Sequence, residues 1–446
     1  MSASSATTTD AESTDIKPTN IESTDVVILS NGPGEVATWV KPVVRSLRHL
    51  APNHKTLRIS VMLSPCPNAS GQEHVILDRY PEVDRVQSAD RFFKFLLTGK
   101  TEGNWDWYDK GIVVFLGGDQ LYTLLAAKRL GYRTAVYAEW DARWVSQIDR
   151  FGVMQPGVAE KANSQYQDKF SVVGDLMADV KTIANEAEIA AALEMSEDGG
   201  LVGFLPGSKP AKLSVGVPLA LAIAHNIYQQ RPGDRFVIGV APNLSLDDLA
   251  AYANPALNPV PAELSGPKAS LVRAKSGLSF FQIENGPKVY LWERFPALDL
   301  FSQCSLCFTT VGANTAQLGS LATPMIVMLP TQGLDNFKMW DGLPGLLVRL
   351  PGVGAIARKV INPIIIRTAQ KTGKLFAWPN IWAKQEVVPE MFGRITAQEA
   401  SGVALDYLAH PEKLNEMRQT LRALRGTANA ADTMADLILE TVDYGK

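Results

Sequence analysis

The strongest constraint on the fold is the regular alternation of short apolar runs with longer amphipathic segments along the 446-residue chain. The apolar runs are continuous, which is typical of strands buried on both faces of a parallel sheet. We expect strands at 26–30, 57–63, 112–116, 134–138, 151–154, 171–173, 201–205, 236–241, 289–292, 306–310 and 325–329. Helices are expected at 36–50, 121–130, 215–229 and 315–321. The alternation predicts an α/β fold with doubly wound parallel sheets.

The strand–helix pattern pauses once, at the Ala- and Glu-rich segment 183–200, which we interpret as a helix followed by a linker. Two successive domains are therefore predicted, at residues 25–195 and 196–395, followed by helices over 396–446. Residues 1–24 are rich in Ser and Thr, contain acidic side chains and lack the apolar stretch of a secretory signal, so a disordered tail is expected there.

The composition excludes several classes of protein. A net charge of −3 does not favour nucleic-acid binding. Cys304 and Cys307 form a C-x-x-C pair inside an apolar run, and no second Cys pair or His cluster completes a zinc site. Buried thiols in a reducing cytosol are therefore favoured over redox or metal chemistry, and no cofactor or metal is expected. No apolar stretch reaches the ~18 residues of a membrane-spanning helix, so a cytoplasmic protein is predicted.

Two expected strands of the first domain end in Gly-rich turns that carry a carboxylate. The first turn is Asn31-Gly32-Pro33-Gly34-Glu35, where glycines let a ligand approach the backbone and the following helix offers free N–H groups. The second is Gly117-Gly118-Asp119, where Asp119 is suited either to act as a general base or to cap the helix that follows. Ligands bind at the carboxyl ends of strands in such sheets.

Two turns of the second domain suit an anion. In Pro206-Gly207-Ser208-Lys209 the lysine is either a point charge for a diphosphate or simply solvated. In the run Val311-Gly312-Ala313-Asn314-Thr315-Ala316-Gln317, small and hydroxyl residues open a helix whose N–H groups can hold phosphate oxygens. Gln317 lies one turn further on and can reach a sugar hydroxyl. Capping of the helix by Asn314 or Thr315 is the alternative.

These turns, in this order, resemble the lipid-A-disaccharide synthase family. The run 115–119 is similar to that family's strand ending in G-x-D, and 204–209 is similar to its L-L-P-G-S-R. Residues 312–325 resemble its S-G-T-A-T-L-E…G-V-P-M, and 378–383 with Glu386 resemble its L-P-N-L-L-A-G…E. Lys209 and Gln317 stand where the family has Arg and Glu, which leaves the donor and the acceptor open.

The resemblance implies a GT-B fold, in which two Rossmann-like domains face one cleft and C-terminal helices cross back to the first domain. It implies an inverting, metal-independent glycosyltransferase that uses a UDP-sugar. Asp119 is then the catalytic base, with Glu35 beside it, and Asn31, Gly32 and Gly34 lie on the acceptor side. The nucleotide-sugar site comprises Gly207, Ser208, Lys209, Gly312, Ala313, Asn314, Thr315, Gln317, Asn380 and Glu386.

A basic apolar segment between Gly342 and Phe376 interrupts the second domain. It has no acidic residue, mixes aliphatic runs with cations, and is flanked by Trp340 and Trp378. This combination is typical of a segment that lies on an anionic membrane. The cations expected to face lipid are Arg349, Arg358, Lys359 and Arg367. A weaker patch, Arg91–Leu97, is interpreted as a loop facing lipid or acceptor.

Three functions are compatible with these features. The first is a glycosyltransferase that takes a lipid-linked or amphiphilic acceptor from the inner face of the membrane. The second is a nucleotide-sugar epimerase on the same fold, which needs no lipid acceptor. The third is a non-catalytic membrane-associated binding protein.

Overall fold

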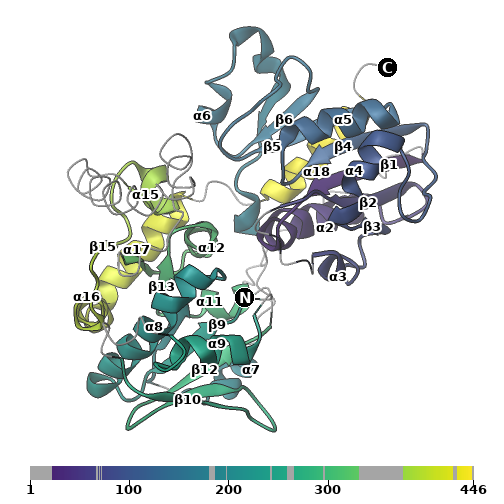
Figure 1. Ribbon diagram of the computed structural model, residues 1–446. Helices are drawn as coiled ribbons and strands as arrows, with labels where there is room; N and C mark the ends of the chain where they lie inside the picture. The colour runs from purple at the N-terminus through teal and green to yellow at the C-terminus, as the bar shows by residue number, and fades with distance from the viewer. Residues whose placement is uncertain are drawn as a thin grey trace, which may run out of the picture.

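The two halves of the chain form two separate sheets, called sheet A and sheet B (Figure 1). The computed structural model describes residues 23–66, 69, 71, 73–179, 186–196, 198–241, 244–258, 266–294, 297–330, 375–424 and 429–443. Over these residues sheet A has seven strands and sheet B has eight. Residues 1–22 of the expected disordered tail and most of the basic apolar segment at 342–376 lie outside the described residues, whereas Thr24 begins β1.

Sheet A is parallel throughout, with the order β3-β2-β1-β4-β5-β6-β7. The chain winds outward from β1 through β3, then returns to the centre with β4 and winds the other way. The strand order therefore reverses between β1 and β4. The strands are β1 Thr24–Ser30, β2 Leu57–Leu63, β3 Arg85–Gln87, β4 Lys110–Phe115, β5 Arg133–Ala138, β6 Arg150–Val153 and β7 Phe170–Val172.

Helices cover both faces of sheet A because successive strand residues point to opposite sides. Val26 and Ile28 of β1 pack against α2 (Lys41–Leu50) and the C-terminal α18 (Ala430–Asp443). Val27 and Leu29 pack instead with α4 (Phe92–Thr98) and α5 (Gln120–Leu130). The remaining short elements are α1 Pro33–Glu35, η1 Val36–Val40, α3 Glu73–Leu77, η2 Ala89–Arg91, α6 Pro156–Ala159, η3 Ser164–Lys169 and η4 Leu176–Asp179.

Sheet B repeats the same winding. Its order is β10-β11-β12-β9-β8-β13-β14-β15, and the order reverses between β8 and β13. The strands from β12 to β15 are parallel, whereas β10, β11 and β12 form an antiparallel edge. The strands are β8 Leu201–Leu205, β9 Arg235–Gly239, β10 Ala269–Val272, β11 Phe280–Ile283, β12 Lys288–Trp292, β13 Leu306–Thr310, β14 Met325–Pro330 and β15 Glu390–Gly393.

The last helix leaves sheet B and packs on sheet A. In Figure 1 the yellow α18 lies within the purple and blue body, next to α2. Helices α16 and α17 stay with sheet B, where α16 packs on α8. The helices of the second half are α7 Glu186–Ala192, α8 Pro210–Gln230, α9 Leu246–Ala253, α11 Leu298–Ser302, α12 Ala313–Ser320, α15 Trp378–Ala383, α16 Ala397–Ala409 and α17 Pro411–Leu424.

This architecture confirms the predicted fold class: two doubly wound α/β units joined by a helix that crosses back. Each of the strands expected from apolar runs is present within one or two residues of its predicted bounds. Strands β3, β10, β11 and β15 were not expected, because they are short and only partly buried. The segment Arg91–Leu97 is not a loop, since Phe92–Thr98 forms α4, with Phe92 and Phe95 buried against the sheet.

Candidate functional site

The four turns singled out in the sequence occupy equivalent places in the two sheets. The turns after β1 and β4 lie on either side of the point where the order of sheet A reverses. The turns after β8 and β13 lie on either side of the point where the order of sheet B reverses. Doubly wound sheets bind ligands outside the carboxyl ends of their strands at this point. The topology therefore makes these turns the candidate site.

The turns after β1 and β4 are in contact. Gly117 has a φ of +129° and Gly118 one of +106°, a region that side-chain-bearing residues avoid. A Cβ on Gly117 would lie 3.0 Å from Oδ1 of Asn31 and 3.2 Å from Cβ of Glu35. The two glycines thus allow the first turn to close over the second. Glu35 is followed by the π-helical turn η1, a local irregularity often found at functional sites.

The carboxyl group of Glu35 is held in a mostly buried position at the end of β1. Burial raises its pKa, a hydrogen bond from its own backbone opposes the rise, and the charge of Glu73 adds to it. A mostly buried carboxylic acid keeps its proton to a higher pH than an exposed one, which suits it to proton transfer. Glu35 therefore has an environment suited to acid–base chemistry.

Asp119, the expected base, occupies a different environment. It is exposed and caps α5, where Oδ1 accepts a hydrogen bond of 2.9 Å from the backbone N–H of Leu121. The capping alternative of the sequence is thus the role that the structure displays. One carboxylate oxygen is used for the cap, so a catalytic role for Asp119 stays a prediction.

Glu139, which sequence reasoning missed, is the most perturbed acid at this edge of sheet A. It directly follows β5, and burial and the negative charge of Asp175 raise its pKa to about 8, with Glu35 adding to the rise. A hydrogen bond from the Trp140 side chain opposes this. The sequence signal was available, since Glu139 ends an apolar run, but no glycine marks its turn.

The turn after β13 begins α12 without a side-chain cap. Gly312 is the N-cap residue, with a φ of +138° that is open only to glycine. Thr315 is fully buried and donates to the carbonyl oxygen of Gly312 at 2.8 Å, so it holds the turn from within. The alternative that Asn314 or Thr315 caps this helix is not what the structure shows, since the N-cap residue is Gly312. The first N–H groups of α12 carry the partial positive charge that attracts anions.

A second missed residue, Lys212, supplies a cation beside this helix start. Its Nζ donates to the carbonyl oxygen of Val311 at 2.7 Å and contacts Oγ1 of Thr310 at 3.4 Å. Within the described part of the chain it has no carboxylate partner. Burial, and then the charge of Lys209, lower its pKa. A largely buried ammonium without a counter-ion is a site for an anion.

Lys209 itself is exposed at the start of α8, where it is the N-cap residue without a side-chain hydrogen bond. Ser208 beside it is also exposed. Gly207 has a φ of +96°, and a Cβ there would lie 3.1 Å from Cδ of Lys212. The predicted turn therefore packs against the Lys212 side chain, whose Nζ lies 3.7 Å from the position of a Cβ on Gly312.

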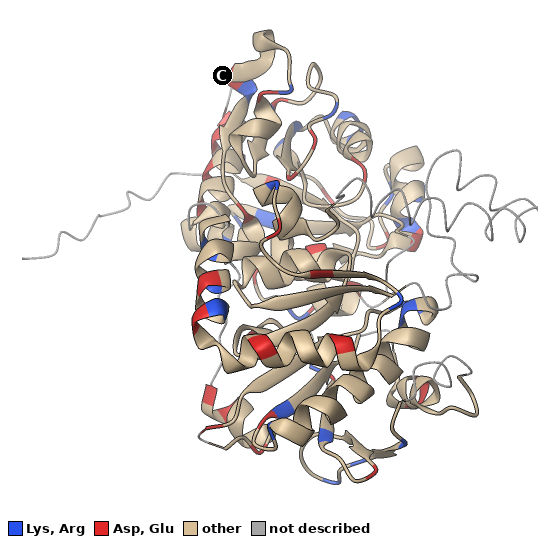
Figure 2. Cartoon of the chain, turned by 90° about the vertical axis from the view of Figure 1, so that its left-hand side faces the viewer, with Lys and Arg blue, Asp and Glu red and all other residues tan. Residues whose placement is uncertain are grey.

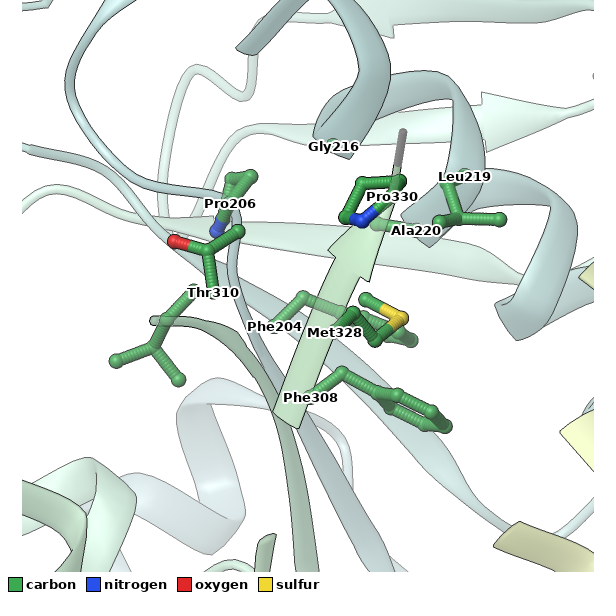
Figure 3. A pocket seen from close by; sticks show the side chains of 10 residues that line it. Phe204, Pro206, Gly216, Leu219, Ala220, Phe308, Thr310, Met328 and Pro330 are labelled. Atoms are coloured by element: carbon green, nitrogen blue, oxygen red, sulfur yellow. The ribbon is translucent and has the colours of Figure 1, made fainter. Parts of the chain in front are cut away.

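An apolar pocket adjoins the two turns (Figure 3). Pro206 and Thr310 line it at the ends of β8 and β13, while Met328 and Pro330 line it from β14. Gly216, Leu219 and Ala220 of α8 close the far side. The pocket thus shares Thr310 with the surroundings of Lys212, so an apolar recess and a cation lie side by side.

Asn380 and Glu386 lie elsewhere in the second domain. Asn380 is 0% exposed, and its amide is fully used: Nδ2 donates to Val388 O and Glu390 Oε1, and Oδ1 accepts from the N–H groups of Val387 and Val388. Asn380 therefore holds α15 to β15. Glu386 is exposed, and its charge acts on Tyr407 of α16. Contact of either residue with a nucleotide sugar stays a prediction.

The two halves of the site meet across the domains. A Cβ on Gly34 would lie 4.0 Å from Nε2 of Gln317, so the first turn of sheet A faces the first turns of α12. Ser320, later in α12, donates to Oδ2 of Asp175 at 2.7 Å. The turn after β1 and the Asp175 carboxylate are thereby brought against α12.

The predicted membrane cations Arg349, Arg358, Lys359 and Arg367 lie outside the described residues. None of the described helices has the length and apolar character to cross a bilayer. Figure 2 shows basic and acidic residues interspersed over the described ribbon. In the same residues, no group of His, Cys, Asp or Glu side chains is arranged to hold a metal ion.

The sequence is similar to a lipid-A-disaccharide synthase. That protein, from Geobacter metallireducens, is 23% identical over 331 residues, which cover 70% of this chain and 70% of the relative. A comparison with protein-family models finds no match. The similarity is distant, and it agrees with the resemblance recognised in the strand-end turns.

Solved structures with similar folds handle UDP-sugars. A putative UDP-N-acetylglucosamine 2-epimerase from Listeria monocytogenes has a TM-score of 0.55 at 14% identity, covering 94% of this chain and 96% of that one. The UDP-GlcNAc 2-epimerase from Neisseria meningitidis, bound to UDP-GlcNAc, has a TM-score of 0.52 at 14% identity, covering 94% and 100%. At these identities the likeness shows the GT-B-type fold.

Proposed function

We propose that this protein is an inverting, metal-independent glycosyltransferase that moves a sugar from a UDP-sugar to a lipid-linked or amphiphilic acceptor. The observation that carries the proposal is Lys212, a partly buried cation without a carboxylate partner in the described residues, beside the uncapped glycine start of α12. The diphosphate of the donor binds at this helix start.

Transfer requires a base opposite the diphosphate. The acceptor hydroxyl attacks the anomeric carbon, its proton passes to a carboxylate, and the bond from the anomeric carbon to the diphosphate oxygen breaks. Lys212 and the N–H groups of α12 stabilise the charge that develops on the departing UDP. Asp119 is the base implied by the resemblance, and Glu35 directly follows Gly34, which lies beside Gln317.

An amphiphilic acceptor is supported by an apolar patch on the first domain. Phe93 and Leu97 of α4 are 50% and 77% exposed, and Leu125 of the neighbouring α5 is 44% exposed. The exposed cations Lys94 and Lys128 lie on the same two helices. Apolar side chains mixed with cations suit contact with an anionic lipid surface. We therefore place the protein at the cytoplasmic face of a membrane.

A donor screen tests the proposal. Purified protein is incubated with a panel of UDP-sugars and a membrane lipid extract, and UDP release is measured with and without the extract. We expect release that depends on the extract. The variants Glu35→Gln and Asp119→Asn are compared with Glu160→Gln, an exposed carboxylate on α6. Loss of a general base lowers the rate by about 10²–10⁴-fold, so the affected variant identifies the base.

Epimerisation of a UDP-N-acetylhexosamine is a second candidate, favoured by Glu139. An acid that is half protonated near pH 8, close to Glu35 in charge contact, suits proton removal and return on one sugar ring. This activity needs no acceptor. NMR detection of an epimerised sugar nucleotide in the absence of lipid extract would favour it over transfer.

A further inference from the structure

The first turn of α15 takes its hydrogen-bond partners from outside the helix. The first N–H groups of an α-helix have no partner within it, and Ala377, the N-cap residue of α15, provides no side-chain cap. Glu390 of β15 accepts instead from the backbone N–H groups of Phe376 and Ala377, at 3.0 and 2.8 Å. The next N–H, that of Trp378, donates to Oγ1 of Thr315 at 3.2 Å. A side chain of α12 therefore completes the start of α15.

The hydroxyl of Thr315 is engaged in two directions. Thr315 is 0% exposed, and while its oxygen accepts from Trp378, its proton is donated to the carbonyl oxygen of Gly312 at 2.8 Å. The backbone N–H of Thr315 donates to the same carbonyl at 3.0 Å. A hydroxyl has one proton to donate, so this proton is committed to the N-cap residue of α12. The carbonyl of Gly312 is thereby held toward Thr315.

A fixed Gly312 carbonyl also fixes the first donor of α12. The peptide unit that joins Gly312 to Ala313 is planar, and in a trans peptide the C=O and N–H groups point to opposite sides. The N–H of Ala313 therefore points away from the side of Thr315, and it is one of the N–H groups that a helix start leaves free for an anion. Gly312 has no side chain to hold its φ of +138°, so Thr315 supplies a restraint that the glycine lacks.

Close packing of α12 on α15 keeps the two ends of this hydrogen bond together. A Cβ on Gly319, later in α12, would lie 2.9 Å from Cγ of Pro379 and 3.4 Å from Cζ3 of Trp382. Helix α15 is itself anchored to β15, because the side-chain amide of Asn380 donates to Val388 O and to Oε1 of Glu390. The hydrogen bond from α15 to Thr315 thus joins two helices that are already in contact.

We propose that Thr315 is a positioning residue of the anion site: its hydroxyl links α15 to the start of α12 and holds the Gly312 carbonyl, so that the first N–H groups of α12 keep their direction. Thr315 does not touch the ligand itself, because it is buried and its hydroxyl proton is donated to Gly312. This role differs from the direct contact with a nucleotide sugar that the resemblance implies for Thr315. The inference rests on the proposed function, since the ligand served is the diphosphate.

Three variants separate positioning from packing. Thr315→Val replaces the hydroxyl by a methyl group, so that the Trp378 N–H loses its acceptor and the Gly312 carbonyl loses a donor. Thr315→Ser keeps the hydroxyl and removes only the methyl group. Thr323→Val is the matched control, because Thr323 lies beyond the other end of α12, is also 0% exposed, and donates its hydroxyl to Phe301 O at 3.0 Å.

The experiment combines calorimetric titration of UDP into the wild type and the three variants with thermal unfolding of each protein without ligand. We expect Thr315→Val to weaken UDP binding by about five- to ten-fold, the equivalent of about one hydrogen bond. Thr315→Ser and Thr323→Val are expected to bind UDP within about two-fold of the wild type. Both valine variants are expected to unfold at a lower temperature, so lost stability alone does not produce this pattern. Thr315→Ala replaces Thr315→Val if that variant does not fold.

Wild-type affinity for UDP in Thr315→Val would overturn the positioning role. Binding by Thr315→Ser as weak as that by Thr315→Val would also overturn it, because the hydroxyl would then not be the group that matters. So would equal weakening in Thr323→Val, which would mark a general effect of lost stability. A wild type that binds no UDP would count against the proposed function itself, so the two failures are distinguishable.

Discussion

The two ends of sheet A treat their charged side chains in opposite ways. At the amino end, Asp25 of β1 is 0% exposed and fully paired: it accepts from Arg58, Arg85 and Tyr132. At the carboxyl end of the same strand, Glu35 is mostly buried with a raised pKa, and Glu139 after β5 shares its surroundings with other acids. One end stabilises the fold, whereas the other keeps acids in a state that costs stability.

The difference marks the carboxyl end of sheet A as the edge that departs from a purely structural role. Buried charges are normally paired, because removal from water is unfavourable without a partner. The amino-end cluster meets this rule, and it is further covered by Arg58 over the Tyr108 ring at 3.9 Å and Arg85 over the Trp105 ring at 4.6 Å. The carboxyl end departs from the rule at the edge where doubly wound sheets bind ligands. Perturbed acids of this kind cluster at active sites.

The largest expected effect is on stability at the amino end. Asp25→Ala leaves Arg58 and Arg85 without their buried partner and is expected to lower the free energy of unfolding by about 3–5 kcal/mol. Urea denaturation followed by tryptophan fluorescence measures this. Asp106→Ala, which removes a carboxylate that is 81% exposed but binds the same arginines, is the control and is expected to change it by under about 1 kcal/mol. Equal losses would contradict the comparison.

At the carboxyl end of sheet A, removal of a charge is expected to raise the free energy of unfolding instead of lowering it. The folded-state pKa of Glu139 is raised from the ordinary 4.5 to about 8, so its charged form destabilises the fold. The penalty is absent below about pH 4.5, grows as the pH rises, and is complete above about pH 8. Glu139→Gln is expected to be more stable than wild type at pH 8, by on the order of 4 kcal/mol, and to lose that advantage at pH 4.5. A variant that is less stable than wild type at both pH values would refute the assignment.

A smaller loss of stability is expected from a substitution at the start of α12, the helix that follows β13. Gly312 has a backbone conformation open only to glycine, so Gly312→Ala is expected to cost about 1–3 kcal/mol of stability and to weaken UDP binding. Gly131→Ala is the matched change at an ordinary left-handed helix end, where φ is +74°; there a loss of about 1 kcal/mol is expected. Thermal unfolding of the two variants with and without UDP separates strain from ligand binding. UDP stabilisation that stays undiminished in Gly312→Ala would exclude a role for this turn.

The sequence alone predicted the fold and the four turns well, for a physical reason. Fully buried parallel strands read as continuous apolar runs, and glycines mark the turns at their ends, so β8 and β13 could be placed to the residue. Strands β10 and β11 were missed because at most every second residue in them is buried, which removes the apolar run.

The site was predicted less completely because it depends on contacts that sequence spacing does not reveal. Lys212 lies between the predicted turn 206–209 and the predicted helix 215–229, three residues beyond Lys209, and only the packing of α8 against β13 places it at Val311. Glu139 acquires its character from Asp175 and Glu35, which are far away in the chain. Asp119 was predicted from the sequence, but its spacing is ambiguous. A carboxylate directly after a buried strand suits a general base and also suits the helix cap that Asp119 forms.

The central claim is that the Lys212 cation and the start of α12 bind the diphosphate of a UDP-sugar. Calorimetric titration of UDP into wild type, Lys212→Met and Lys413→Met tests it most directly, since Lys413 is an exposed lysine paired with Asp406. Loss of a hydrogen bond to a charged group costs about 1.5–3 kcal/mol. The account predicts that Lys212→Met weakens UDP binding by about ten-fold or more, with no change for Lys413→Met. Absence of UDP binding by the wild type, or equal affinity in all three proteins, would contradict it.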